Sequence, residues 1–462
     1  MNARQHSRER ARERARQTAR NLGAFLLAAC VGLAGATACG DDAKKPDVPT
    51  NPSASGNGTP GGAKPSSTTP PLELAVPESK SGLTGDAKTA YEKGWKSWLD
   101  GDLQGAKNAF VDAAGKAPKA GAPHYAEGVV MERLGDAGGA QQEYKTAISL
   151  EPENEIAIGA LAVSLAKGGR VSDAESLLNE KKAKMPKSAK ILVFLAEVKS
   201  LGNDHASAQQ YAQDALRMSP DLKEAMVAIG RDHYRAKRTE LAKYALQAVL
   251  EGFGEQQPPR DKDNPEAHLL RGLIFREQGL RAAAMKDFET VVARRPDYYE
   301  ALLNLGAMRL EAGNVLEAMP LLEGATRYAP QNAAGHLSLG DCYRLVGRTA
   351  EAKRELETSL SRDSTLAAAH YNLGLLYLFA QKLPGYSPAE QVAAAIKEFD
   401  TYRTMRGPKS PAGINDDIDE LQNRAKAKQA ELQNAATAAS APAAGTGTAA
   451  PAPAATGTAK PK

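Results

Sequence analysis

Apolar residues along this chain recur in paired runs that each have the spacing of one helix. Between residues 121 and 154, apolar side chains fall three and four residues apart from Tyr125 to Leu134, and again from Ala140 to Leu150. A Gly-Asp-Ala-Gly-Gly cluster separates the two runs, and this composition is typical of a turn. Pro152 follows the second run and cannot continue a helix. The pattern therefore predicts two helices joined by a turn, that is, one helix hairpin.

Small residues and prolines repeat along the chain with a period of about 34 residues. Three series keep this step: Gly94, Gly128, Ala162, Ala196 and Gly230; Ala106, Ala140, Ala174 and Ala208; Pro118, Pro152, Pro186 and Pro220. Small side chains are expected where the two helices of a hairpin cross closely. A fixed period of this size predicts a solenoid in which one hairpin is stacked many times.

The residues at these positions resemble the tetratricopeptide repeat (TPR) family. Its signature has Gly or Ala at position eight, Ala at twenty, a large apolar residue at twenty-four and Pro at thirty-two. The first unit offers Gly94, Ala106, Phe110 and Pro118 at these places. The resemblance implies an all-α fold, an α-solenoid of about nine TPR helix hairpins that form a right-handed superhelix. The units are counted from Ala87, Gly121, Glu155, Ala189, Lys223, Pro265, Tyr299, Ala333 and Ala367.

Interruptions of the period divide the repeats into two blocks. Units one to five cover residues 87–254 and units six to nine cover 265–406, with an insertion loop at 255–264 between them. This polar loop either lets the array bend or is a tolerated surface insertion. A polar helix is predicted at 414–435, where it would cap the last repeat against solvent.

Residues 1–38 have the pattern of a bacterial lipoprotein signal peptide. Seven arginines and two glutamates precede an uncharged apolar run from Leu22 to Ala38. Cys39 ends that run and is the predicted site of lipidation, with Cys30 as the alternative because Leu27 stands three residues before it. An uncleaved membrane anchor is the remaining alternative, although about 17 apolar residues are marginal for a membrane span.

Both ends of the remaining chain have a composition that does not support a packed core. Residues 39–86 are rich in Pro, Gly, Ser and Thr and are predicted to be a disordered tether, and 436–462 are predicted to be a disordered Ala/Pro tail. The full chain carries +4. The leader accounts for +5 of it, so a chain cleaved before Cys39 is close to −1 and no nucleic-acid role follows.

No motif in the sequence indicates catalysis, and we expect no enzymatic activity, no cofactor and no metal. Walker, G-x-S-x-G, H-E-x-x-H and C-x-x-C motifs are absent from the sequence. His124, His268, His336 and His370 share position four of their units and lie a repeat or more apart, so we interpret them as packing residues. Cys342 has no cysteine partner in its unit and is expected to be a buried thiol.

The TPR resemblance implies a concave groove lined by positions two, five, nine, twelve and thirteen of each first helix. The candidate groove residues are Tyr91, Trp95, Trp98, Leu99, Tyr125, Val129, Leu269, Leu273, Leu303, Leu310, Tyr371, Leu375, Leu378 and Phe379. Aromatic and aliphatic side chains of this kind bind peptides and proteins, and an apolar partner segment is favoured over an acidic tail. Alternatively, the two tryptophans only cover the open end of the first hairpin.

These features together predict a lipid-anchored scaffold that faces the periplasm and binds protein subunits of a cell-envelope complex. The outer membrane is favoured over the inner one, and oligomeric state is left open. In layout the chain is most similar to the adventurous gliding-motility TPR lipoproteins of myxobacteria. Two alternatives are an assembly factor for outer-membrane pores, pili or secretion channels, and a glycan-binding partner or regulator of cell-wall enzymes.

Overall fold

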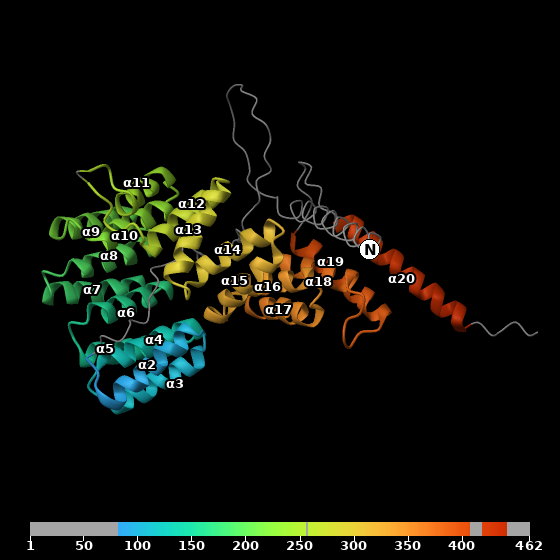
Figure 1. Cartoon of the computed structure of the whole chain (residues 1–462), viewed down its shortest axis with the longest axis horizontal. Helices are drawn as coiled ribbons and strands as arrows, with labels where there is room; N and C mark the ends of the chain where they lie inside the picture. Colours follow the sequence, from blue (N-terminus) through green and yellow to red (C-terminus); the bar gives the residue numbers. More distant parts are fainter. Residues whose placement is uncertain (1–81, 256, 407–417, 441–462) are drawn as a thin grey trace, which may run out of the picture.

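The computed structural model describes residues 82–255, 257–406 and 418–440, and these residues form nineteen helices and no strand. The helices pair into nine hairpins, followed by one long helix (Figure 1). Their bounds are α2 Gly85–Leu99, α3 Leu103–Lys116, α4 Gly121–Leu134, α5 Ala137–Leu150, α6 Glu155–Lys167, α7 Val171–Lys184, α8 Ala189–Leu201, α9 His205–Met218, α10 Lys223–Arg235, α11 Thr239–Leu250, α12 Pro265–Glu277, α13 Arg281–Arg294, α14 Tyr299–Glu311, α15 Val315–Tyr328, α16 Ala333–Leu345, α17 Thr349–Arg362, α18 Ala367–Phe379, α19 Pro388–Arg406 and α20 Ile418–Ser440.

The all-α solenoid of nine hairpins that the sequence predicts is confirmed. From the second hairpin onward, each first helix begins at the residue from which its unit was counted, and α2 begins two residues before Ala87. The final described helix spans Ile418–Ser440 and overlaps the helix predicted at 414–435, of which residues 414–417 lie outside the described residues. The leader at 1–38, most of the tether and residues 441–462 of the tail lie outside the described residues.

Small residues at position eight make room for a large side chain of the second helix. A Cβ atom on Gly128 would lie 2.5 Å from a ring carbon of Tyr144, and one on Gly94 would lie 2.6 Å from the ring of Phe110. Ala140, Tyr144 and Phe110 are fully buried. The recurring glycine is therefore a packing requirement, because a methyl group there would overlap the ring that fills the hairpin.

The turn inside the first eight hairpins uses one residue with a left-handed backbone, always at the same place in the repeat. Glycine occupies it in six hairpins, and a non-glycine residue does so in two: Gly101, Gly135, Gly169, Gly279, Gly313, Gly347, Asn203 and Lys237. Three of the following helices are capped by an aspartate whose side chain accepts a backbone N–H, at Asp102, Asp136 and Asp204. This turn chemistry reverses the chain so that the two helices pack against each other.

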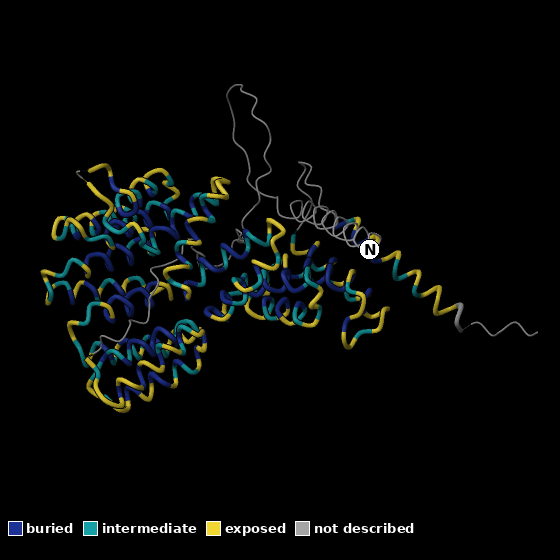
Figure 2. The backbone as a smooth tube through the Cα atoms, in the orientation of Figure 1, coloured by how far each residue is buried: buried dark blue, intermediate teal, exposed yellow. Residues whose placement is uncertain are grey.

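The hairpins follow a curved path, so that the first two return to lie beside the seventh (Figure 1). Buried positions lie along the packed faces of the helices, and exposed ones gather at the turns and outer faces (Figure 2). In the described part of the chain, no helix has the length and apolar content that crossing a membrane requires.

Candidate functional site

The structure does not gather the predicted groove residues into one open surface. Eight are buried: Tyr91, Trp98, Tyr125, Val129, Leu269, Tyr371, Leu375 and Leu378. Five are half-buried, Trp95, Leu99, Leu273, Leu303 and Leu310, and one is exposed, Phe379. The reasons for burial differ between the two ends of the array.

Tyr91 belongs to the core of the first hairpin. Its ring centroid lies 5.1 Å from that of Phe110 on α3, and its side chain is fully buried. The side chain therefore packs against the second helix of its own hairpin and offers no surface to a partner.

Trp98 is buried because the superhelix closes on itself at this point. Its indole N–H donates to Asp297 Oδ2 at 3.2 Å, across 199 residues of sequence. The Tyr328 hydroxyl donates to the carbonyl of Leu99 at 2.5 Å. The Gln331 amide donates to the carbonyl of Leu134 at 3.0 Å. We call this set of contacts, which joins hairpins one and two to hairpin seven and the loops on either side of it, the closing contact.

A guanidinium group lies at the centre of the closing contact. The Arg133 guanidinium carbon is 5.3 Å from the Trp98 ring centroid and 4.8 Å from that of Tyr299, distances that allow cation–π attraction. Arg295 donates two hydrogen bonds to Asp297, at 2.8 and 2.7 Å. Burial opposes the charged form of Asp297, but the bonds from Arg295 outweigh it and hold the pKa of Asp297 below its usual value. The closing contact therefore combines the packing of Arg133 on two aromatic rings with the ion pair between Arg295 and Asp297.

The first helices of hairpins four to six carry a buried row of charges at groove positions. Glu197 accepts from Arg231 at 3.1 Å and from Arg235 at 2.6 Å, and Arg231 also donates to Glu266 at 2.7 Å. Glu197 and Arg231 are only 2% and 3% exposed. Burial would raise the pKa of Glu197, but Arg235 and Arg231 outweigh it and lower that pKa to about 2. The expectation of an apolar groove overlooked these residues, although the same register would have found them.

At the other end, α20 packs mainly against α19, the second helix of hairpin nine, and reaches the first helix at its edge. Ile418 and Leu421 share a buried cluster with Tyr371 and Leu375. The Lys428 ammonium donates to the carbonyl of Leu378 at 3.2 Å. This helix occupies the place that a further repeat would take, and it covers part of hairpin nine from solvent.

The apolar groove residues that keep solvent access in hairpins seven and nine are Leu303, Leu310 and Phe379. Leu303 and Leu310 lie on α14 and pack at the edge of the buried cluster that hairpins seven to nine share. Phe379, the last residue of α18, is 52% exposed. We call these three residues the C-terminal apolar surface.

The four histidines at position four are held by carboxylates of the second helix rather than by apolar packing alone. The distances from Nδ1 are 2.7 Å for His124 to Glu143, 2.8 Å for His268 to Asp287, 2.7 Å for His336 to Glu355 and 2.6 Å for His370 to Glu398. Each pair joins the two helices of one hairpin. The sequence contained this signal, because in three of the pairs the acid follows the histidine by 19 residues.

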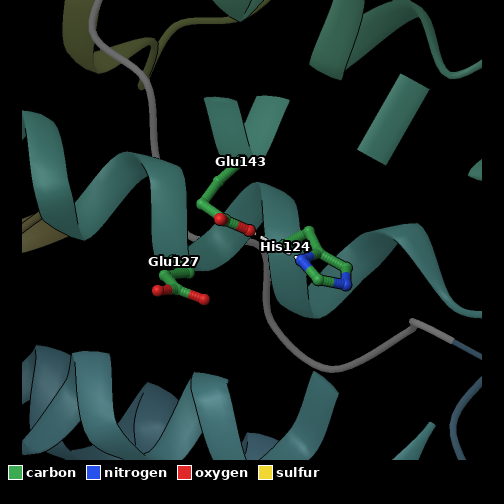
Figure 3. A group of neighbouring side chains, drawn as sticks. All are labelled: His124, Glu127 and Glu143. Atoms are coloured by element: carbon green, nitrogen blue, oxygen red, sulfur yellow. Dashed lines mark hydrogen bonds and ion pairs between the residues drawn. The ribbon is translucent and has the colours of Figure 1, made fainter. Parts of the chain in front are cut away.

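Glu127 stands beside the first of these pairs (Figure 3). It lies one helical turn after His124 on α4 and is 8% exposed. Burial and then the nearby Glu143 raise the pKa of Glu127 to about 7, against opposing contributions from Lys107 and His124. This cluster combines one imidazole with two carboxylates.

Comparison with known proteins agrees with the hairpin geometry. Two family profiles described as tetratricopeptide repeat match this chain, one at residues 132–198 and 309–376 and the other at 269–333. These segments are tetratricopeptide repeats. TPR arrays are typically non-catalytic scaffolds that bind other proteins, which agrees with the rows of helices described above.

Curated relatives share the repeats over part of their length. The chain is 22% identical over 232 residues to human protein O-mannosyl-transferase TMTC1, and this match covers 50% of the chain and 26% of the relative. It is 29% identical over 126 residues to a probable UDP-N-acetylglucosamine–peptide N-acetylglucosaminyltransferase, SPINDLY, of Hordeum vulgare, covering 25% of the chain and 13% of that protein. The chain thus spans about a quarter or less of these relatives.

Solved TPR structures resemble the chain at low sequence identity. The APC/C hetero-tetramer Cut9–Hcn1 is 15% identical, with a TM-score of 0.48 and coverage of 72% of this chain and 62% of that one. Yeast Tom70 is 12% identical, with a TM-score of 0.44 and coverage of 65% and 66%.

Proposed function

We propose that the protein is a lipid-anchored TPR scaffold that holds protein subunits of a bacterial cell-envelope complex on the periplasmic side of the membrane. The observation that carries the binding role is the C-terminal apolar surface, where Phe379 remains 52% exposed at the end of a buried first helix. Aromatic and aliphatic side chains at such a site are the anchors that partner segments use. The inner face of the first hairpins is occupied by the closing contact, so the partner binds hairpins seven to nine.

The location rests on the sequence from residue 1 to residue 42. An arginine-rich start, an apolar run and Cys39-Gly-Asp-Asp form the order of a lipoprotein signal followed by a polar tether. At about 5–6 Å × √n, a tether of about 45 residues has a typical reach of roughly 35–40 Å. This reach lets an anchored array bind partners away from the bilayer. The order of signal, tether, repeat array and Ala/Pro tail in this chain favours an anchor in the outer membrane. The same order favours the gliding machinery as the envelope complex that the protein serves.

The anchor is tested by metabolic labelling with an alkyne fatty acid in a bacterial host. We expect Cys39→Ser to abolish labelling and to release the protein into the soluble periplasmic fraction, with Cys30→Ser as the matched control that keeps both properties. Loss of label only in Cys30→Ser would move the anchor to that residue. An unlabelled wild-type protein would refute lipid anchoring.

The binding role is tested by placing a photo-crosslinking amino acid at Phe379 or Leu303 in cells. Leu316, which is 77% exposed on the second helix of hairpin seven, is the control position. We expect discrete envelope-protein adducts from the first two positions and none from the third, and mass spectrometry then identifies them. Motor subunits would support the gliding machinery, whereas pore or secretin subunits would support the assembly-factor alternative. Equal adducts from all three positions would refute the proposed surface.

A further inference from the structure

Hairpin two brings three side chains with metal-binding atoms to one place. His124 and Glu127 lie three residues apart and therefore on the same face of α4, and Glu143 reaches them from α5 (Figure 3). One ligand atom from each of the three lies within 4.8 Å of the other two. The set contains one imidazole nitrogen and two carboxylate oxygens.

The other hairpins provide an internal comparison, because they hold the same His–carboxylate pair with a different residue at position seven. Hairpin six has Arg271 there, and its guanidinium donates to both oxygens of Asp287, at 2.8 and 2.7 Å. Hairpins eight and nine have Leu339 and Leu373 at this position. Hairpin two alone among these four adds a second carboxylate, where hairpin six adds a cation.

The second carboxylate is largely buried and lacks compensation among the described residues. Glu127 is 8% exposed, and no described residue donates a hydrogen bond to it or forms an ion pair with it. Lys107 on α3 and then His124 on the same helix oppose the effect of Glu143, but no ion pair joins either of them to the Glu127 carboxylate. A largely buried carboxylate beside a second carboxylate is stabilised by an additional positive charge, and the arrangement leaves a place for one.

We propose that His124, Glu127 and Glu143 bind a divalent transition-metal ion, with Zn²⁺ as the representative. Three protein ligands of mixed nitrogen and oxygen type leave room for a water molecule in a four-coordinate shell. Ligand atoms about 2.0–2.2 Å from an ion lie roughly 3.3 Å from one another. Side-chain rotations that move each ligand atom by about an ångström therefore convert the cluster into a coordination shell. An imidazole ligand favours Zn²⁺ over Mg²⁺, which prefers oxygen alone.

The ion has a structural role in this arrangement. It joins the two helices of hairpin two and replaces the ion pair that Arg271 provides in hairpin six. Because Glu127 and His124 come from one helix and Glu143 from the next, binding stabilises the hairpin only when both helices are folded.

Isothermal titration of the metal-free full chain with ZnCl₂ tests the site. We expect Glu127→Gln and His124→Gln each to weaken the tightest Zn²⁺ binding at least about tenfold, since even residues that only orient a metal ligand are worth 10–100-fold. His336→Gln is the matched control, because it removes the same kind of pair where position seven is leucine. All variants keep the same cysteines as wild type, so the differences report on hairpin two.

Hydrogen exchange of the amides of α4 and α5 provides the second measurement. Zn²⁺ should slow exchange in wild type and in His336→Gln, and leave it unchanged in Glu127→Gln. The glutamine has the volume of glutamate, and the metal-free variant should be at least as thermostable as wild type because it lacks the buried carboxylate. Zn²⁺ affinities within twofold of wild type for both hairpin-two variants, or an equal loss in His336→Gln, would overturn the proposal.

Discussion

Removing the charge of Glu197 should unfold the middle of the array locally, because this carboxylate neutralises two buried guanidinium groups. Glu197, Arg231 and Arg235 have side chains that are 2%, 3% and 5% exposed. In Glu197→Gln both arginines lose their shared counter-charge. Removing one partner of a buried ion pair typically costs about 3–5 kcal/mol.

The pKa of Glu197 gives an independent magnitude. Arg235 and Arg231 outweigh the cost of burial and lower it from 4.5 to about 2. Each pKa unit corresponds to about 1.36 kcal/mol, so the charged form contributes about 3 kcal/mol to folding. Because the folded-state pKa is depressed, this contribution is present above about pH 4.5 and is lost as the pH falls toward 2. Glu197→Gln should lack this part of the acid sensitivity.

Hydrogen exchange is the suitable assay, since each repeat contacts mainly its neighbours and the loss is local. At pH 7 we expect amides of α8, α10 and α12 to exchange on the order of a hundredfold faster, because every 1.4 kcal/mol is a factor of ten. Glu240→Gln on α11 is the control, because Glu240 is 77% exposed beside Lys243 and its loss should change little. A change below about 1 kcal/mol for Glu197→Gln would refute the assignment of these charges as a stabilising network.

Two further substitutions test the packing within a hairpin and the closure of the superhelix. Ala140→Leu should lower the free energy of unfolding by about 1–3 kcal/mol in urea denaturation, since Ala140 is fully buried at the helix crossing. Unchanged stability would show that this alanine does not lie at the crossing. Trp98→Ala should cost about 3–5 kcal/mol and increase the radius of gyration in X-ray scattering, because it removes the indole of the closing contact. Trp95→Ala, in a half-buried position of the same helix, is its control, and identical scattering from both variants and wild type would argue against closure.

The hairpins could be predicted because their determinants are local. A glycine at position eight and a large residue at position twenty-four belong to the same hairpin, as Gly128 and Tyr144 do. The turn between them needs only a residue with a left-handed backbone, such as Gly135. Such short-range requirements recur in each unit, so the repeat period alone located the helices.

The binding surface was less predictable, because burial depends on the path of the whole array. Trp98 and Phe379 both occupy positions that the repeat register assigns to the groove. In the structure, however, Trp98 is 1% exposed and Phe379 is 52% exposed. Their difference arises from Asp297, 199 residues away from Trp98, and from the absence of such a contact at Phe379 among the described residues. Nothing in the spacing within one repeat specifies this distant neighbour.

The histidine cluster lies between these two cases. His124 and Glu127 are on one helical face by their spacing, and Glu143 follows His124 by the same 19 residues that separate His268 from Asp287. The repeat pattern was therefore sufficient to predict the His124–Glu143 pair. The expectation of no metal considered only the histidines, which lie a repeat or more apart, and not the carboxylates beside them. That Glu127 is buried without a counter-charge from the described residues became evident only from the packing of α3 against α4.

The amino-acid sequence by itself determined the repeating unit, its helices and its turns, because small and large side chains within one repeat satisfy one another. Tertiary structure decided which inner faces remain open. Small rotations between successive hairpins add up along the array until Trp98 meets Asp297 and the first turn of the superhelix closes. The closure depends on the relative rotation at every interface between successive hairpins. No single sequence position specifies that total rotation, so only the assembled fold determines whether the superhelix closes.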